Sequence, residues 1–455
     1  MSIEQESPDR KKRSLWKVAA YVSLAASVIL LVCVLVLLLF PDTYINKFLK
    51  GQIINGLTKA YPAYSIKIAD VHYKVSENSI EVDSITIKAK DSTFSCHIAE
   101  LSLRGVGWMK VLREGSIAPR CLTNSIVHVQ QIVMTFGENT FHCQQLRVSV
   151  PDSSIVAEAL ELHPLVNDEQ FFANSKFKRT RCRLVIPQCR VIGADFLGMM
   201  QENIYRIHSA HVDSVSLDLM LNMDKPFDIN SPSPPMPHEL LSSIKGTLQI
   251  DSLYLQGRVK YSERFAVGTV PGVVTFDDIK MSVEGIANRT NRGTPINIHA
   301  QAKFMNSGAM TVHMSIPVAS ADLSLRYYGS LGKMDMNKIN QYLEIAEHTR
   351  IKSGILQEAK FDINVTAGHA RGSVRGVYKD FSIAVLDKHT GSETGLVNRV
   401  TSFIANLFKL RKSNIPDKSG KMKIGVVDYT RKPDETFIQF IWPALRGGLG
   451  NVAGF

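Results

Sequence analysis

The sequence lacks every common catalytic signature. It contains no GxSxG, GxGxxG, Walker A or HExxH pattern, so no known spacing arranges a nucleophile, a base, a phosphate loop or a metal pair. The closest approach to a metal site is His208 with His211, but a three-residue offset in a strand-like segment turns the two rings to opposite faces. We therefore expect a protein that is not an enzyme and that holds no metal and no cofactor.

Cysteine is scarce and follows no metal-binding pattern. One of the six cysteines, Cys33, lies in a long apolar run, and no CxxC or Cys/His spacing of the zinc type occurs among the others. Those others are odd in number and cannot all pair within one chain: Cys96, Cys121, Cys143, Cys182 and Cys189. Two interpretations of Cys182 and Cys189 stay open, a disulfide that closes a small hairpin or two buried apolar side chains.

Net charge is almost absent from the middle of the chain. The formal charge is +11, but residues 1–17 carry five basic and three acidic side chains, and residues 399–432 carry nine against two. Subtracting these contributions of +2 and +7 leaves +2 for the long intervening stretch. An extended phosphate-binding surface needs clustered positive charge, so we expect no nucleic acid partner.

One long uncharged run is present, from Val18 to Phe40. Its twenty-three residues, with a rise of about 1.5 Å each, span the roughly 30 Å hydrocarbon core of a bilayer. Pro41 follows directly, without the small-residue cleavage site of a signal peptide. Because basic residues precede the run, the sequence predicts a cytoplasmic tail over 1–17, a single transmembrane helix over 18–40, and the rest of the chain across the membrane.

Beyond this run, a short repeat dominates the sequence. Its unit is apolar-x-apolar, two mostly polar or small residues, then apolar-x-apolar, and successive copies within a series start 14 to 16 residues apart. Alternation with period two indicates β-strands. Copies begin at Ile66, Ile80, Cys96, Val127, Phe141, Ile155, Ala210, Leu248 and Val274.

The polar pair in the middle of each copy decides the shape of the strand. The step across the pair is three residues, which in a regular strand would move the second half of the apolar set to the other face. A β-bulge that adds one residue restores the phase and bends the strand, so we expect long strands creased in the middle. The alternative is two short strands joined by a two-residue turn, although a pair such as Asp83-Ser84 lacks the Gly or Asn that such turns favour.

Helical periodicity is sparse by comparison. Apolar residues at three- and four-residue spacing predict a helix over Asn337–His348, with Asp335 as its cap, and an amphipathic helix over 395–412. Five prolines between Lys225 and His238 predict a linker or exposed loop. The remaining regions are a first β region over 41–224, a second over 239–394, and a terminal strand with a hydrophobic tail over 413–455.

These few helices are too small to cover a long one-sided sheet. Either two sheets close on each other as a dry sandwich, or the sheet leaves an apolar groove that needs an apolar occupant. We expect a mainly β protein in which an elongated, curved antiparallel sheet of about 20 strands forms such a groove, with a few short α-helices. The side chains chosen as its lining are Ile80, Val82, Ile85, Ile87, Leu101, Leu103, Leu146, Val148, Leu248, Ile250, Leu253 and Leu255.

The helix over 395–412 combines an apolar stripe with lysines and arginines. This composition is typical of a helix that lies on an anionic membrane surface, and it equally suits a helix that packs its stripe against the sheet. The residues assigned to the membrane-surface role are Phe403, Ile404, Leu407, Phe408, Lys409, Arg411 and Lys412.

Three stretches of the chain resemble AsmA-like proteins, relatives of the TamB-type and bridge-like lipid transfer proteins. They are the basic tail and apolar run with the segment from Leu39 to Ala89, the segment from Asp322 to Ile383, and the closing Phe437 to Gly450. Recognisable positions of the middle segment are Gly332, Asp335, Leu343, Ile351, Gly354, Phe361, Gly368, Gly372, Gly376, Tyr378 and Phe381. The resemblance implies a bacterial inner-membrane anchor and a periplasmic β-groove that handles lipid.

We therefore expect a lipid-binding or lipid-transfer protein that carries phospholipid along the groove for outer-membrane biogenesis. It would be a single-pass inner-membrane protein with the bulk of the chain in the periplasm and a possible outer-membrane contact at its C-terminus. The alternative is a non-enzymatic scaffold or assembly factor that binds an envelope protein partner through strand edges and the C-terminal segment.

Overall fold

The computed structural model describes most of residues 50–454. Outside the described residues lie 1–49, 52, 60, 75–76, 108–118, 266–269, 290–293, 319, 321, 388–391, 394–409 and 455. The expected tail 1–17, the expected transmembrane helix 18–40 and most of the expected helix 395–412 are therefore not described. No helix in the part that is described is long and apolar enough to cross a membrane.

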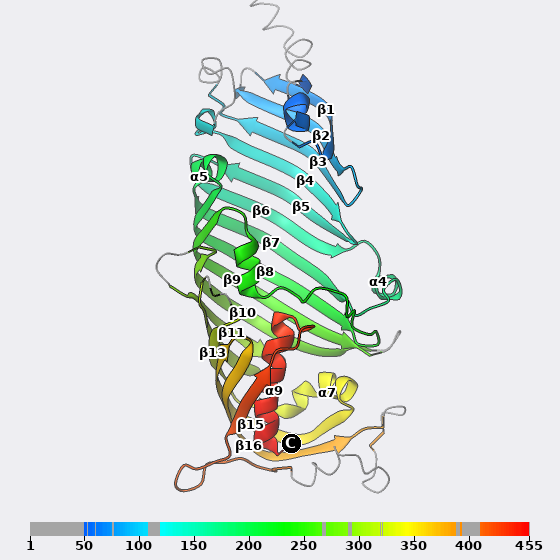
Figure 1. Cartoon of the computed structure of the whole chain (residues 1–455), viewed down its shortest axis with the longest axis vertical. Helices are drawn as coiled ribbons and strands as arrows, with labels where there is room; N and C mark the ends of the chain where they lie inside the picture. The colour runs from blue at the N-terminus through cyan, green and yellow to red at the C-terminus, as the bar shows by residue number, and fades with distance from the viewer. Residues whose placement is uncertain are drawn as a thin grey trace, which may run out of the picture.

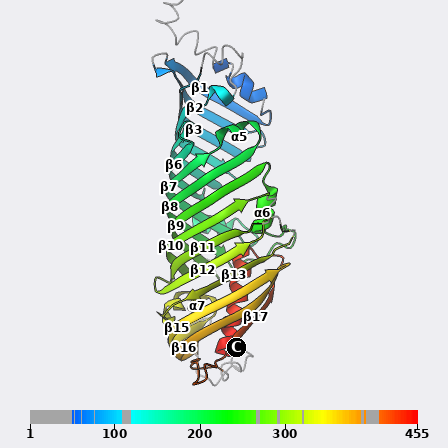
Figure 2. The same cartoon turned by 90° about the vertical axis from the view of Figure 1, so that its left-hand side faces the viewer.

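The described chain forms one long, curved sheet of 17 strands with a few short helices (Figures 1 and 2). This confirms the mainly β prediction. The strands are β1 Tyr64–Lys74, β2 Ser79–Ala89, β3 Phe94–Arg104, β4 Ile126–Phe136, β5 Asn139–Ser149, β6 Ser154–Pro164, β7 Thr180–Ala194, β8 Ile204–Asn222, β9 Thr247–Arg264, β10 Gly272–Ala287, β11 Ile296–Phe304, β12 Gly308–Ile316, β13 Leu325–Leu331, β14 Met334–Asp335, β15 Thr349–Thr366, β16 His369–Val385 and β17 Gly425–Thr430.

Neighbours in the sequence are neighbours in the sheet. Each strand from β1 to β12 pairs with the next, β13 and β14 both pair with β15, and β16 and β17 follow. Among the described pairings only β8 with β9 is parallel. In the part of the chain that the structure describes, β1 pairs only with β2 and β17 only with β16, so the sheet is unclosed. Its sixteen rows are separated by fifteen intervals of about 4.8 Å, which make it roughly 72 Å long.

A line of creases runs across the first strands, as expected, but its mechanism differs from the prediction. The ladder of β2 and β3 passes from Asp83 opposite Glu100 to Ile85 opposite Ile98, so neither strand has an extra residue. Every pairing from β1 to β7 keeps its register in this way. The predicted bulge is wrong for these strands because each carries its crease at the same level, and the creased residues face one another.

The crease residue of every second strand is in the left-handed region of φ. The values are 48° at Ser84, 52° at Gln131, 49° at Ala159, 57° at Ser214 and 50° at Asp278. Each is the second member of its polar pair, so the repeat marks these positions in the sequence. Register shifts of the bulge type first appear between β8 and β9, and again between β9 and β10. There a creased strand lies beside one that is regular at the same level.

The crease brings all four apolar residues of a copy to one face. The copies on β1 and β2 form a single cluster in which Ile80 and Val82 are both 5% exposed and Val71 is completely buried. Each copy is also one continuous strand, so the alternative of two short strands joined by a turn is excluded for the strands described.

Short helices accompany the sheet. They are η2 Pro119–Cys121, α4 Asp168–Ala173, α5 Phe196–Gln201, α6 Pro237–Ser243, η3 Met336–Ile339, α7 Asn340–Ala346 and α9 Phe437–Ala453, and residues 50, 51 and 53–59 are helical too. The helix expected over Asn337–His348 is present as η3 and α7, with the carboxylate of Asp335 accepting from the amide of Asn337 at 3.0 Å.

The C-terminal region contains the expected strand, β17, and also a helix that the sequence pattern did not predict. The glycines and Pro443 within α9 disfavour a helix, but packing against the sheet overrides that preference. A capping box of Thr436 and Gln439 was the signal that marked its start. Arg411 and Lys412 are not helical; the amide of Arg411 donates to the carbonyl of Ala453, and the carbonyl of Lys412 accepts from Phe381.

Candidate functional site

The apolar face of the sheet is the candidate site, and its ends are covered. At the N-terminal end, Ile53 and Ile54 of the helical residues 53–59 pack onto the cluster formed by β1 and β2. Of the predicted lining residues, Ile80, Val82 and Ile85 are buried there. These side chains therefore belong to a packed core.

The C-terminal end is covered by α9. Phe440, Ala444 and Val452 of this helix are at most 1% exposed, and they pack on apolar side chains of β10 to β17. Small residues allow close approach, since a Cβ on Gly448 would lie 2.5 Å from a methyl of Val374. Arg446 reaches Glu347 at 2.6 Å. The helix is thus held by packing along one side and by an ion pair on the other.

Helix α7 completes this cover. Tyr342 is 7% exposed and packs beside Val274 and Leu356, and its hydroxyl donates to Glu263 at 3.0 Å. Burial, with the carboxylate of Glu263 adding to it, raises the pKa of Tyr342. The tyrosine therefore remains a neutral donor that anchors α7 to the end of β9.

Between these ends the apolar face is only partly buried. Helix α9 lies on β16 and β17 and α7 on β10 and β15, whereas α5 contacts β8. We call the half-buried apolar side chains of β3 to β9 the apolar floor. Its members include Leu101, Leu103, Val127, Ile132, Met134, Phe141, Leu146, Val148, Ile155, Leu160, Leu162, Leu184, Ile186, Cys189, Val191, Val212, Leu217, Leu219, Leu248, Ile250, Leu253 and Leu255.

The floor is deepest along the crease. Val129, Cys143, Ala157 and Val215 each stand next to the polar pair of their strand and are 3% to 8% exposed. Residues at the ends of a copy, such as Val148 and Leu162, are more exposed. The chain therefore buries the line of the crease by its own side chains and leaves the flanking side chains in contact with solvent.

Sequence reasoning found part of the floor and missed one copy of the repeat. Eight of the predicted lining residues lie in the floor as defined here, and Ile87 packs at its N-terminal border. The missed copy is on β7, where Leu184 and Val191 flank Pro187-Gln188 and lie opposite floor residues of β6. The same spacing was present, but a proline in place of a small polar residue concealed it.

The apolar face has no polar chemistry to offer a ligand. Backbone groups of β3 to β8 are engaged in ladders on both sides of each strand. Within the described residues no group of three His, Cys, Asp or Glu side chains is placed to hold a metal ion. The face suits a ligand that needs contact with hydrocarbon and no hydrogen bonds.

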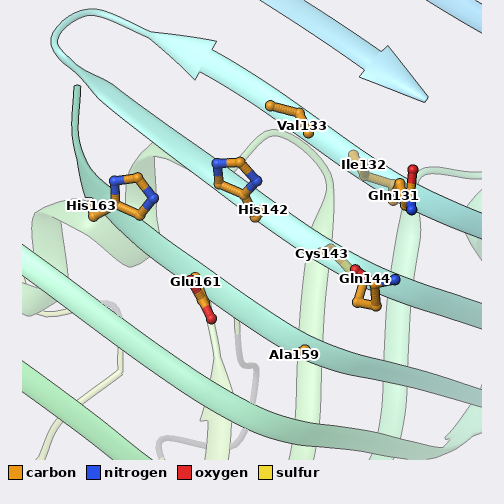
Figure 3. A pocket seen from close by; sticks show the side chains of 9 residues that line it. All are labelled: Gln131, Ile132, Val133, His142, Cys143, Gln144, Ala159, Glu161 and His163. Atoms are coloured by element: carbon orange, nitrogen blue, oxygen red, sulfur yellow. The ribbon is translucent and has the colours of Figure 1, made fainter. Parts of the chain in front are cut away.

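Two open hollows lie along the crease. One, of about 330 Å³, is lined by residues of β4, β5 and β6 and holds His142 and His163 with their rings stacked 5.3 Å apart (Figure 3). The other, of about 1030 Å³, borders β8 to β12 and contains the 2.7 Å ion pair of Lys303 with Asp278. The thiol of Cys143, which also lines the first hollow, donates to the carbonyls of Gln145 and Glu158 rather than to a histidine.

His208 and His211 contact different partners. The first lies 3.2 Å from a carboxylate oxygen of Asp251, and the second stacks on Tyr254 at 4.9 Å between ring centres. They form no metal pair.

The structure settles the question left open for Cys182 and Cys189. Both lie on the single strand β7, seven residues apart, and both are free thiols. A disulfide needs Cα atoms closer than about 7 Å, whereas seven residues of strand extend roughly 23 Å. Burial raises the pKa of both thiols, as expected for side chains that serve as small apolar residues.

One edge of the sheet beside the floor carries exposed arginines. Arg104 ends β3, Arg147 lies near the end of β5, and Arg206 lies near the start of β8 at the same edge. Arg190 of β7 stands nearby and donates to Gln188 at 3.0 Å. Arg104 lies 3.4 Å from Glu77 and Arg206 3.7 Å from Asp195, so these guanidinium groups are only loosely engaged.

Comparisons with known proteins identify no relative. No family model matches the chain, and no curated protein matches it.

The seven residues assigned to a membrane surface fall into two groups. Phe403, Ile404, Leu407, Phe408 and Lys409 are outside the described residues, while Arg411 and Lys412 lie beside β16.

Proposed function

We propose that this chain is a membrane-anchored lipid-binding protein that carries phospholipid in an apolar groove formed by its creased strands. The observation that carries the proposal is the apolar floor, a set of aliphatic side chains between two covered ends. Each methylene buried there would contribute about 0.8 kcal/mol. Binding alone accounts for the site, and no chemical step is part of the proposal.

Lipid is favoured over a protein ligand because of what the face lacks. A bound peptide needs hydrogen-bond partners for its backbone, and the strands beneath the floor are already paired on both sides. An acyl chain has no such requirement. The apolar run from Val18 to Phe40 also supports a lipid ligand, since a membrane anchor there would hold the floor beside a source of lipid.

The arginine edge supports a phospholipid in particular. With acyl chains along the floor, a headgroup would remain in water at the ends of the strands, where Arg104 and Arg206 are exposed. A guanidinium group binds phosphate through paired hydrogen bonds. We assign Arg104 and Arg206, which lie at the ends of their strands, to headgroup contact; Arg147 and Arg190 alternate with floor residues and lie on the opposite face.

The location proposed for the protein follows from the resemblance to AsmA-like proteins. It is a single-pass protein of the bacterial inner membrane whose sheet extends into the periplasm and serves outer-membrane biogenesis. The roughly 72 Å sheet is shorter than the ~100 Å that 20 strands would give.

A scaffold or assembly role is the second candidate. It is supported by the unpaired edges of β1 and β17, which are free to add a strand from a partner. Crosslinking from the last 40 residues separates the two functions. One dominant protein product favours assembly, and products with lipid alone favour lipid handling.

Lipid extraction and mass spectrometry of the purified chain test the main proposal. We expect phospholipid to accompany the wild type from mild detergent and its amount to fall several-fold in Leu146→Glu, which places a charge on the floor. The matched control is Val156→Glu, because Val156 lies opposite Arg147 on the other face of the same strand pair. Equal lipid in both variants, or none in the wild type, would overturn the proposal.

A further inference from the structure

The parallel pair of β8 and β9 imposes a long connection on the fold. Ile204 lies opposite Thr247 at one end of the pair, and Asn222 lies opposite Arg264 at the other. The chain leaves β8 at Asn222 and enters β9 at Thr247, so residues 223–246 must return along the full length of the strands. A hairpin could not do this, and the return has to cross one face of the sheet.

The crossing is on the apolar face. Met236, in the middle of the connection, is completely buried and belongs to one cluster with Val283 of β10 and Phe440 of α9. Leu241 of α6 packs against the same cluster. The guanidinium of Arg431 donates to the carbonyl of Pro234 at 2.9 Å, which ties the connection to the end of β17. We call residues 223–246 the strap.

The strap marks a change in burial along the sheet. On its C-terminal side, Val283, Ile296, Ile316, Leu325 and Ile363 are at most 7% exposed under α9 and the strap. On its N-terminal side, the floor residues of β4 to β8 are partly exposed, and within the copies of the repeat burial of the same depth is confined to residues beside the crease such as Val129 and Cys143. The space above the face is thus filled beyond β9 by the chain itself.

The other border is the helical segment 53–59. Its Ile53 and Ile54 cover the cluster of β1 and β2, and the cluster extends to Ile98 and Leu101 of β3. The floor is therefore bounded by protein at both ends. From β3 to β9 there are six inter-strand intervals, a length of about 29 Å.

We infer that the floor is a bounded compartment that takes the acyl chains of one or two phospholipid molecules as discrete cargo. A hydrocarbon core of about 30 Å contains two leaflets, so the chains of one lipid extend about 15 Å. Two such lengths fill the compartment. A continuous file of lipids along the whole sheet would need the space that α7, α9 and the strap occupy. The inference rests on the proposed function, because it concerns the same site.

The test combines counting and mapping on the full-length chain. Purified protein is equilibrated with phosphatidylethanolamine that carries a photoreactive diazirine on one acyl chain. Native mass spectrometry counts the bound lipids, and peptide mapping after illumination locates the crosslinks. We expect one or two lipids per chain and crosslinks on the floor peptides of β3 to β9, with none on the apolar residues of β11, β12, β15 or β16.

The other outcomes separate the inference from the proposed function. A count that continues to rise above two, or crosslinks along β11 to β16, would overturn the bounded compartment and leave lipid binding in place. No bound lipid and no crosslink would overturn lipid binding itself, and the inference with it. Crosslinks confined to β1 and β2 would show that the helical segment 53–59 is no border.

Discussion

The close packing of α9 on the sheet can be tested by substituting two adjacent glycines of this helix. Gly448 faces β16 and β17, where a Cβ would lie 2.5 Å from Val374 and 2.7 Å from Val427, and both valines are at most 2% exposed. Gly447 is exposed and a Cβ there would meet nothing within 4 Å. Each is inside the same helix, so replacement by alanine brings the same gain in helix propensity, about 0.8 to 1 kcal/mol.

The two variants therefore differ only in packing. Gly447→Ala should stabilise α9 by about that gain. Gly448→Ala adds a methyl group to a filled interface, where overpacking costs about 1 to 3 kcal/mol. The predicted difference between the variants is that same cost, which corresponds to a roughly 5- to 150-fold difference in local opening.

Hydrogen exchange measured by mass spectrometry on peptides that cover α9 reads this opening directly. Amides of α9 should exchange more slowly in Gly447→Ala than in the wild type and faster in Gly448→Ala than in Gly447→Ala, with peptides of β3 to β6 unchanged in both. Equal protection in the two variants would refute the close seating of α9 on β16 and β17, and with it the filled C-terminal end of the apolar face.

Three further outcomes follow from the structure. Arg181 is 1% exposed and pairs with two carboxylates, so Arg181→Met should lower the free energy of unfolding by about 3 to 5 kcal/mol. The control Arg183→Met removes an exposed pair and should change the free energy of unfolding by less than about 1 kcal/mol. Thermal melting measures both. The hydrogen bonds of Arg326 hold the pKa of Asp362 below its ordinary value. The stability from this pair is therefore present above about pH 4 and declines as the pH falls. Asp362→Asn should flatten that part of a plot of melting temperature against pH. Reduction should leave the mass of the peptide with both β7 cysteines unchanged, and a disulfide there would contradict the continuous strand.

Local patterns predicted the strands and the side of each strand that is apolar. The copies from Ile66 to Ile87 form β1 and β2 with their apolar residues in one cluster, and the helix near Asn340 has the expected cap at Asp335. Both predictions rest on contacts between residues close in sequence. The copy around Pro187 was missed because its polar pair is atypical, and α9 was missed because its glycines oppose helix formation in isolation.

The sequence predicted an apolar groove, but it did not predict how far along the sheet that groove remains uncovered. Ile85 and Leu146 both follow the polar pair of their copy directly, yet Ile85 is buried beneath a helix and Leu146 is partly open. Nothing within either copy distinguishes them. The difference comes from segments distant in sequence, residues 53–59 at one end and α9 at the other.

The amino-acid sequence by itself determined the creased strands, the one-sided apolar face and the near-neutral middle of the chain, because all three follow from the order of neighbouring side chains. Tertiary structure alone decided that the creases align without a slip in register, that β8 and β9 run parallel, and that the strap and α9 fill one half of the face. These features depend on which strands become neighbours and on what returns across them. Long-range packing therefore turned a uniform repeat into a floor with two borders.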